Sequence, residues 1–260
     1  MSAAALISDS KPKKQAVTQK PAGAADFAFS ADANVEFKMR WIDSIEELES
    51  LRPAWNELAN NATHRNPNFE SNFLIPAMRH LASKDVRVLV AEAEFGEHTT
   101  LAALIPFATT KVFGLPLSAM EIWHHEQSFD STPLIRSECA SLVWPQIISC
   151  LQQEKISFLK MEQTSAEGPF EALVEQMESQ PNVTLFRKNV FSRAAIRPSG
   201  TADEYKQKQF SKNLRKSTRR QLKKLEALGN ISFEKSDGHS DFESLANEFL
   251  NVEASGWKGT

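Results

Sequence analysis

Cysteine is scarce in this chain, and its two cysteines are badly placed for a disulfide bond. Cys139 and Cys150 lie eleven positions apart in a segment with the apolar spacing of a helix. Eleven residues of helix span about 16 Å, which is beyond the reach of a disulfide. The sequence therefore predicts two buried structural thiols and a reducing, cytoplasmic setting.

Glycine is also sparse, and long apolar runs are absent. The nine glycines are scattered, so there is no glycine-rich loop of the P-loop or dinucleotide-binding type. No run approaches the roughly 18 apolar residues of a membrane span, and the apolar core of "MSAAALISDS" is too short for a secretory signal. We expect neither a membrane span nor export.

The residues that are present have the balance of a soluble globular protein, with 41% hydrophobic and 24% charged side chains. The formal net charge is −3, but it is unevenly distributed. Residues 206–224 hold nine basic side chains and no acid, which leaves 21 basic and 33 acidic residues, or −12, elsewhere. The basic stretch is therefore a local feature of an acidic chain.

The pattern along the chain predicts a disordered tail over residues 1–33 and an N-terminal domain over residues 34–198. The tail lacks apolar periodicity. In the domain we expect strands and helices in the order β-α-α-β-β-β-α-β-α-β(β), from period-2 and helical spacing. The expected elements are strands in 34–43, 86–95, 99–114, 117–129, 156–163 and 182–198, and helices in 44–61, 68–83, 137–154 and 169–179. The fold class is α/β, with a mixed sheet flanked by helices.

A second unit is expected over residues 199–260. It should hold a long helix from Thr201 to Leu228 stopped by Gly229, a strand in 230–236 and a helix in 241–257. One strand cannot satisfy its own backbone, and one side of the last helix needs a cover. We therefore expect this unit to be incomplete within these 260 residues. The apolar residues on that side are Phe242, Leu245, Phe249 and Val252.

The basic helix has an amphipathic pattern, with leucines on one face and cations around the rest. We expect the leucines to dock on a core, which leaves three roles for the cations: a solvated face, a site for a phosphate-bearing or other anionic ligand, or contact with nucleic acid or a membrane surface. No aromatic residue follows Phe210 in this stretch, which disfavours single-stranded nucleic acid. The candidate anionic-ligand or cleft residues are Arg215, Arg219, Arg220, Trp257 and Lys258.

Two adjacent histidines, His124 and His125, invite a metal hypothesis that the pattern does not support. Neighbours in a strand point to opposite faces, and "HEQSF" lacks the second histidine of the metalloprotease helix. We predict no metal site. One of the two histidines either faces a ligand cleft or makes a structural hydrogen bond.

The chain resembles the GNAT superfamily of acyltransferases, and within it the CelD-like branch related to the FemAB-type aminoacyl transferases. The resemblance rests on "AWNELA", "NPNFESNFLIPAMRHL", the junction "SRAAIRPSGTADEYKQKQFSKNLRKSTRRQLKKLEALGNISFE", and "VEASGWKGT". It implies two GNAT-like halves, with the basic helix linking them.

The same resemblance implies transfer of an acyl group from acetyl-CoA or another acyl-CoA to an amine or hydroxyl. The acceptor would be a small molecule or a glycan-linked group, in cell-surface polysaccharide metabolism. In such folds amides at a helix start hold the pyrophosphate, a splayed strand positions the thioester, and a base or water accepts the proton.

The usual pyrophosphate loop of the family does not occur in this sequence. The resemblance also implies that most of the catalytic half is missing from these 260 residues, so no catalytic residue is carried over. We expect the chain alone to be inactive. A non-catalytic module that binds a partner or a sugar nucleotide is the alternative, and a nucleic-acid-binding role for residues 206–224 is the weaker one. The sequence does not indicate an oligomeric state.

Overall fold

The computed structural model describes residues 35–82, 85–95, 98–112, 115–180, 182–194, 200–232 and 241–256. The chain divides into two units, Met1–Val190 and Phe191–Thr260. The tail predicted over 1–33 lies outside the described residues.

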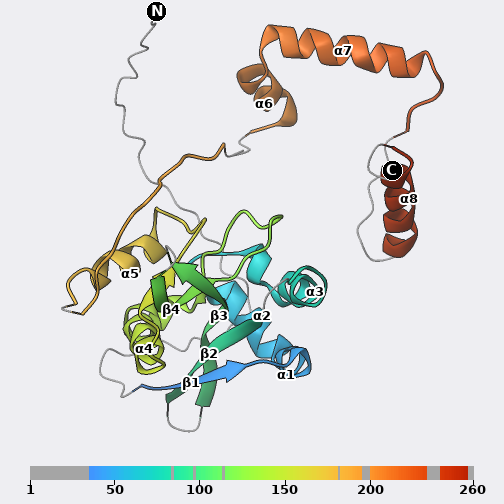
Figure 1. The fold of residues 1–260 in the computed structure, drawn as a ribbon. Coiled ribbons are helices and arrows are strands. Elements are labelled where there is room, and N and C mark those ends of the chain that lie inside the picture. The colour runs from blue at the N-terminus through green and yellow to red at the C-terminus, as the bar shows by residue number, and fades with distance from the viewer. Residues whose placement is uncertain are drawn as a thin grey trace, which may run out of the picture. The chain divides into compact units, whose positions relative to one another are not determined.

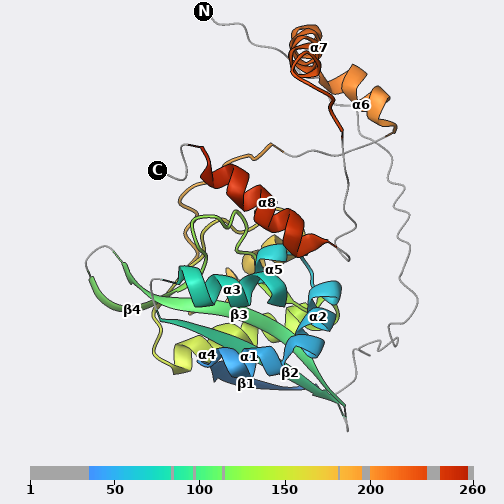
Figure 2. The ribbon, with the colours of Figure 1, turned by 90° about the vertical axis from the view of Figure 1, so that its right-hand side faces the viewer.

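The first unit is built on one mixed sheet in the order β1-β2-β3-β4-β6, with β5 also paired to β3. Consecutive strands β1 to β4 pair antiparallel, whereas β4 and β6 pair in parallel. Figures 1 and 2 show β2 and β3 running side by side, with β1 next to β2. The strands are β1 (Glu36–Ile42), β2 (Val86–Phe95), β3 (His98–Val112), β4 (Leu115–Ile122), β5 (Leu134–Ile135) and β6 (Phe158–Lys160).

Helices cover both faces of this sheet, with α1, α2 and α3 on one side and α4 and α5 on the other (Figure 1). The largest fully buried side chains include Trp55, Phe69, Phe107, Trp144 and Phe170, so the core is continuous across the sheet. The helical elements are α1 (Ile45–Ser50), α2 (Arg52–Asn61), η1 (Pro67–Phe69), α3 (Ser71–Leu81), η2 (Ser137–Cys139), α4 (Ala140–Gln153) and α5 (Pro169–Met177). This α/β architecture confirms the predicted fold class.

Proline and capping residues explain where several helices begin. Ser44 accepts a hydrogen bond from the Glu47 backbone N–H at 3.1 Å and so caps α1. The single helix expected over 44–61 is split in two, because Pro53 occupies the first turn of α2. Pro76, by contrast, is accommodated inside α3.

The strand expected in 182–198 is wrong for its described part, because residues 182–194 contain no strand. Arg187 instead forms ion pairs with Glu171, Glu175 and Glu178 on α5 and in the turn that follows it. The segment thus interacts with α5 through charges, and Phe186 stays 80% exposed. Residues 195–199 lie outside the described part of the chain.

The second unit contains α6 (Ala202–Gln209), α7 (Lys212–Glu226) and α8 (Phe242–Ala254). The expected long helix is broken at Phe210, because Thr201 and Glu204 form a capping box for α6 and Ser211 caps α7 anew. No residue of α7 is buried by the described part of the second unit, and the expected docking of its leucines on a core stays a prediction. Residues 230–232 form no strand, and 233–240 lie outside the described residues.

Candidate functional site

The chain leaves the sheet between β4 and β5 and forms a polar loop, residues 123–133, which we call the β4–β5 loop. β4 and β5 pair with successive parts of β3, at Phe107 and at Leu104 respectively. The parallel pair β4–β6 ends at the start of the same loop, at Glu121 opposite Lys160. Carboxyl ends of neighbouring parallel strands are the usual ligand-binding edge of an α/β sheet.

A histidine and an aspartate meet at this loop. His64 Nε2 lies 2.6 Å from Asp130 Oδ2, and their side chains are 30% and 29% exposed. The hydrogen bond to Asp130 raises the pKa of His64 above its ordinary value, against a smaller opposing effect of burial. Burial pushes the pKa of Asp130 upward, but hydrogen bonds from His64 and Thr132 outweigh it, so that this pKa is lowered.

A network of buried amides and backbone groups holds Asp130 in place. The Thr132 backbone N–H donates to Asp130 Oδ1 at 2.8 Å. The fully buried Asn66 donates from Nδ2 to the Thr132 carbonyl at 2.8 Å and to the Asp130 carbonyl at 3.2 Å. Asn68 Nδ2 also donates to the Asp130 carbonyl, at 3.1 Å. Because the fully buried Asn66 joins the carbonyls of Asp130 and Thr132, it holds this part of the loop around Asp130.

His64 is fixed from the other side by the sheet. Thr63 N–H donates to the Ile135 carbonyl at 2.7 Å, and Ala62 forms a β-bridge with Arg136. Arg136 is itself buried, where it donates to the Leu101 carbonyl at 2.8 Å and pairs with Glu57. The segment that follows α2 is therefore hydrogen-bonded to β5 and to the residue after it. These contacts fix the position of His64 next to Asp130.

His125 lies in the same loop and has a different environment. Its ring stacks on Phe73 of α3, with centroids 5.6 Å apart, and Nδ1 accepts a hydrogen bond from the Gln127 backbone N–H at 3.1 Å. Burial, and secondarily the neighbouring His124, lower the pKa of His125. The neutral ring therefore carries its proton on Nε2, which is buried without a hydrogen-bond partner in the described part of the chain.

The His64–Asp130 pair has the chemistry of a general base. The carboxylate accepts the hydrogen on Nε2, which fixes the tautomer in which Nδ1 is unprotonated. A proton taken up at Nδ1 would create an imidazolium that Asp130 stabilises. The arrangement can therefore remove a proton from an amine or hydroxyl placed against Nδ1.

The cysteines offer no comparable chemistry. Burial raises the pKa of Cys139 to about 12 and, to a smaller extent, raises that of Cys150. Both are free thiols, but only Cys139 is buried, so the prediction of two buried thiols is wrong for the partly exposed Cys150. Across the described ranges no cluster of three or more His, Cys, Asp or Glu could hold a metal ion, and none of the described helices is long and apolar enough to cross a membrane.

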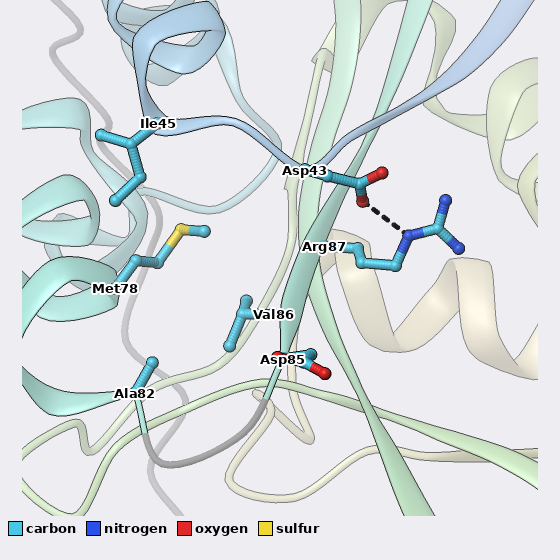
Figure 3. A pocket seen from close by; sticks show the side chains of 7 residues that line it. All are labelled: Asp43, Ile45, Met78, Ala82, Asp85, Val86 and Arg87. Carbon is cyan, nitrogen blue, oxygen red and sulfur yellow. Dashed lines mark hydrogen bonds and ion pairs between the residues drawn. The ribbon is translucent and has the colours of Figure 1, made fainter.

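A hollow lies elsewhere on the first unit, between the starts of α1 and β2 and the end of α3 (Figure 3). Arg87 Nε pairs with Asp43 Oδ1 at 2.7 Å across its edge, and the guanidinium lies over Trp41, 4.6 Å from the ring centroid. The Asp43 carboxylate is therefore paired with Arg87, and we do not consider it a candidate general base. The lining residues are Asp43, Ile45, Met78, Ala82, Asp85, Val86 and Arg87.

The site residues predicted from the sequence lie in the second unit. Arg215, Arg219 and Arg220 are on α7, whereas Trp257 and Lys258 lie outside the described residues. Sequence reasoning singled out His125 but missed His64 and Asp130. A usable signal was present, because both sit among Asn, Ser, Thr and Pro in "THRNPNF" and "SFDSTP", the composition of a structured polar loop.

Comparison with solved structures returns acetyltransferases at low similarity. One is a ribosomal-protein-alanine N-acetyltransferase from Brucella melitensis biovar Abortus 2308, at 13% identity and a TM-score of 0.37, covering 61% of this chain and 100% of that one. Another is AAC(6')-Iy in complex with the bisubstrate analog CoA-S-monomethyl-acetylneamine, at 10% identity and TM-score 0.37, covering 62% and 99%. A third is a possible acetyltransferase from Clostridium difficile 630, at 10% identity and TM-score 0.37, covering 62% and 99%.

No family model matches the chain, and no curated protein matches it. The function therefore has to be argued from the chain's own residues.

Proposed function

We propose that the first unit is the acyl-transfer domain of an acyl-CoA-dependent N- or O-acyltransferase, with its reaction centre at the β4–β5 loop. The observation that carries the proposal is the His64–Asp130 pair, held by buried Asn66 at the carboxyl ends of the parallel strands β4 and β6. The CelD-like branch and an acceptor from cell-surface polysaccharide metabolism belong to this proposal as its context, on the strength of the sequence resemblance.

In the proposed reaction His64 Nδ1 takes the proton of the acceptor amine or hydroxyl. The acceptor nitrogen or oxygen forms the new bond to the acyl carbon, the bond from that carbon to sulfur breaks, and the thiolate recovers a proton from His64. Asp130 keeps its carboxylate charge throughout.

The residues around the β4–β5 loop are suited to proton transfer, but they are poorly suited to tight binding of the CoA phosphates. The helix starts that follow β4 and β6 on the chain each carry an acid in their first turn, Glu138 in η2 and Glu171 in α5. Acids at a helix start repel a phosphate there. Arg136, at the head of η2, is already paired with Glu57. We therefore expect weak acyl-CoA binding by this chain.

The experiment follows acyl transfer from acetyl-CoA to a panel of small amines and sugar hydroxyls, with acylated product measured by mass spectrometry. Asp130→Asn should lower product formation by roughly a hundredfold or more, because general-base catalysis contributes about that much. Asp43→Asn, which breaks the exposed pair with Arg87, is the matched control and should leave the rate within about twofold. An equal rate in Asp130→Asn, or binding of acetyl-CoA without transfer to any acceptor, would favour the non-catalytic binding module.

A further inference from the structure

The helix α7 presents a line of leucines that the described residues of the second unit do not cover. Leu214, Leu222 and Leu225 are 47%, 39% and 54% exposed, and no residue of α7 is buried. At 3.6 residues per turn the three side chains fall on one narrow stripe, with Thr218 between them. We call this the leucine stripe of α7.

Cations occupy most of the helix face opposite the leucine stripe. Arg215 borders the leucine stripe beside Leu222, and the other cations lie farther round the helix. On the other side of the stripe, Gln221 and Ser217 separate it from Lys224. Glu226, at the last position, is the only acid of the helix. The cations of α7 are Lys212, Arg215, Lys216, Arg219, Arg220, Lys223 and Lys224.

We propose that α7 is a peripheral membrane-binding element that lies in the interface of a bilayer containing anionic phospholipids. Such an interface can bind both faces of the helix. The leucine stripe is buried at the boundary of the acyl chains, and the cations pair with lipid phosphates. Arg215, at one edge of the stripe, is placed to extend its apolar stem over it and reach the phosphates. This role is independent of acyl transfer at the β4–β5 loop.

Charge distribution along the chain supports this orientation. Outside residues 206–224 the chain carries −12, so an anionic surface attracts this stretch and repels the rest. The chain would therefore meet the bilayer through α7 and keep the first unit in water.

Two other occupants fit the helix less well. A nucleic acid would neutralise the cations but leave the leucine stripe in water, and no aromatic residue from Ser211 to Gly229 could stack on bases. A second α7 would bury the stripe, but it would bring together two helices that each carry seven cations and one acid, which is unfavourable.

The test is co-sedimentation of the full chain with vesicles of phosphatidylcholine alone or mixed with phosphatidylglycerol, at about 0.15 M salt. Wild type should partition to the mixed vesicles at least tenfold more strongly. Arg219→Ala with Lys223→Ala should weaken partitioning about 25-fold, since each cation near an anionic surface contributes about fivefold. Leu222→Ala with Leu225→Ala should weaken it about tenfold through lost apolar burial.

The matched control is Lys206→Ala with Lys208→Ala, which removes the same charge from α6 and should lower partitioning by no more than about fivefold. All three double variants should keep the wild-type helical circular dichroism, because the altered side chains are exposed. Equal partitioning to both vesicle types, or no loss in the leucine variant, would overturn the proposal. So would cation-dependent binding to duplex DNA without vesicle binding, or self-association that buries the leucine stripe.

Discussion

The shared proton between His64 and Asp130 sets the chemistry of the β4–β5 loop. A carboxylate 2.6 Å from an imidazole nitrogen stabilises the protonated ring, so the pKa of His64 is raised. Titration of the His64 ring by NMR should therefore give a pKa above about 6.5, and Asp130→Asn should move it back toward that value. A pKa unchanged by the substitution would show that the two groups do not interact in solution.

The same pair should make stability depend on pH in a defined window. The raised pKa of His64 stabilises the fold below about pH 6.5, and that contribution is lost as pH rises through the raised value. The lowered pKa of Asp130 stabilises the fold above about pH 4, and that contribution is lost as pH falls through the lowered value. Urea denaturation should thus separate wild type from Asp130→Asn most clearly near pH 5.5 and less near pH 9. A difference that grows with pH would contradict this assignment.

At the scale of single residues the sequence shows which side chains are candidates but not which of them meet. His64 and Asp130 are 66 positions apart, and they meet because Ala62 bridges to Arg136 and because Asn66 reaches two carbonyls of the β4–β5 loop. Contacts between loops leave no periodic pattern in the sequence, so the sequence does not predict them. The buried thiol of Cys139, by contrast, followed from apolar helical spacing alone.

At the scale of the element, amphipathic pattern alone did not decide burial. The helices α2 and α7 both show an apolar stripe, but Leu58 of α2 is fully buried against the sheet while Leu222 of α7 is 39% exposed. Leu58→Ala should lower the free energy of unfolding by roughly 2–5 kcal/mol, as core truncations do. Leu222→Ala should change it by only about 0.5 kcal/mol. Chemical denaturation of both variants measures the contrast, and a loss of several kcal/mol in Leu222→Ala would mean that α7 docks on a core after all.

Strand prediction succeeded where a partner strand was available. Alternation in 36–42 gave β1, which pairs with β2 over seven residues. Equally suggestive alternation in 182–194 gave no strand. In this segment Val183 and Leu185 pack against the core, and Arg187 pairs with carboxylates of α5 and the turn after it. Period-2 spacing therefore predicts that a segment can form a strand, but not whether it pairs.

At the scale of the molecule the two units differ in how well their backbones are protected. The first unit surrounds its sheet with buried side chains, whereas α6, α7 and α8 contain no buried residue. Amide hydrogens of β3 should exchange at the rate of global unfolding, and those of the three helices many orders of magnitude faster. Hydrogen exchange read by mass spectrometry tests this directly. Protection of α8 equal to that of β3 would show a cooperative unit that includes both.

The most direct test of the proposed reaction centre is to map which residues acetyl-CoA contacts. Hydrogen exchange should be compared with and without millimolar acetyl-CoA at about 0.15 M salt, which screens nonspecific attraction to exposed cations. We predict slower exchange in β4, the β4–β5 loop and the residues that follow β6, with no change in α7. Slower exchange confined to α7, or no change anywhere in the first unit, would contradict a transfer site at His64 and Asp130.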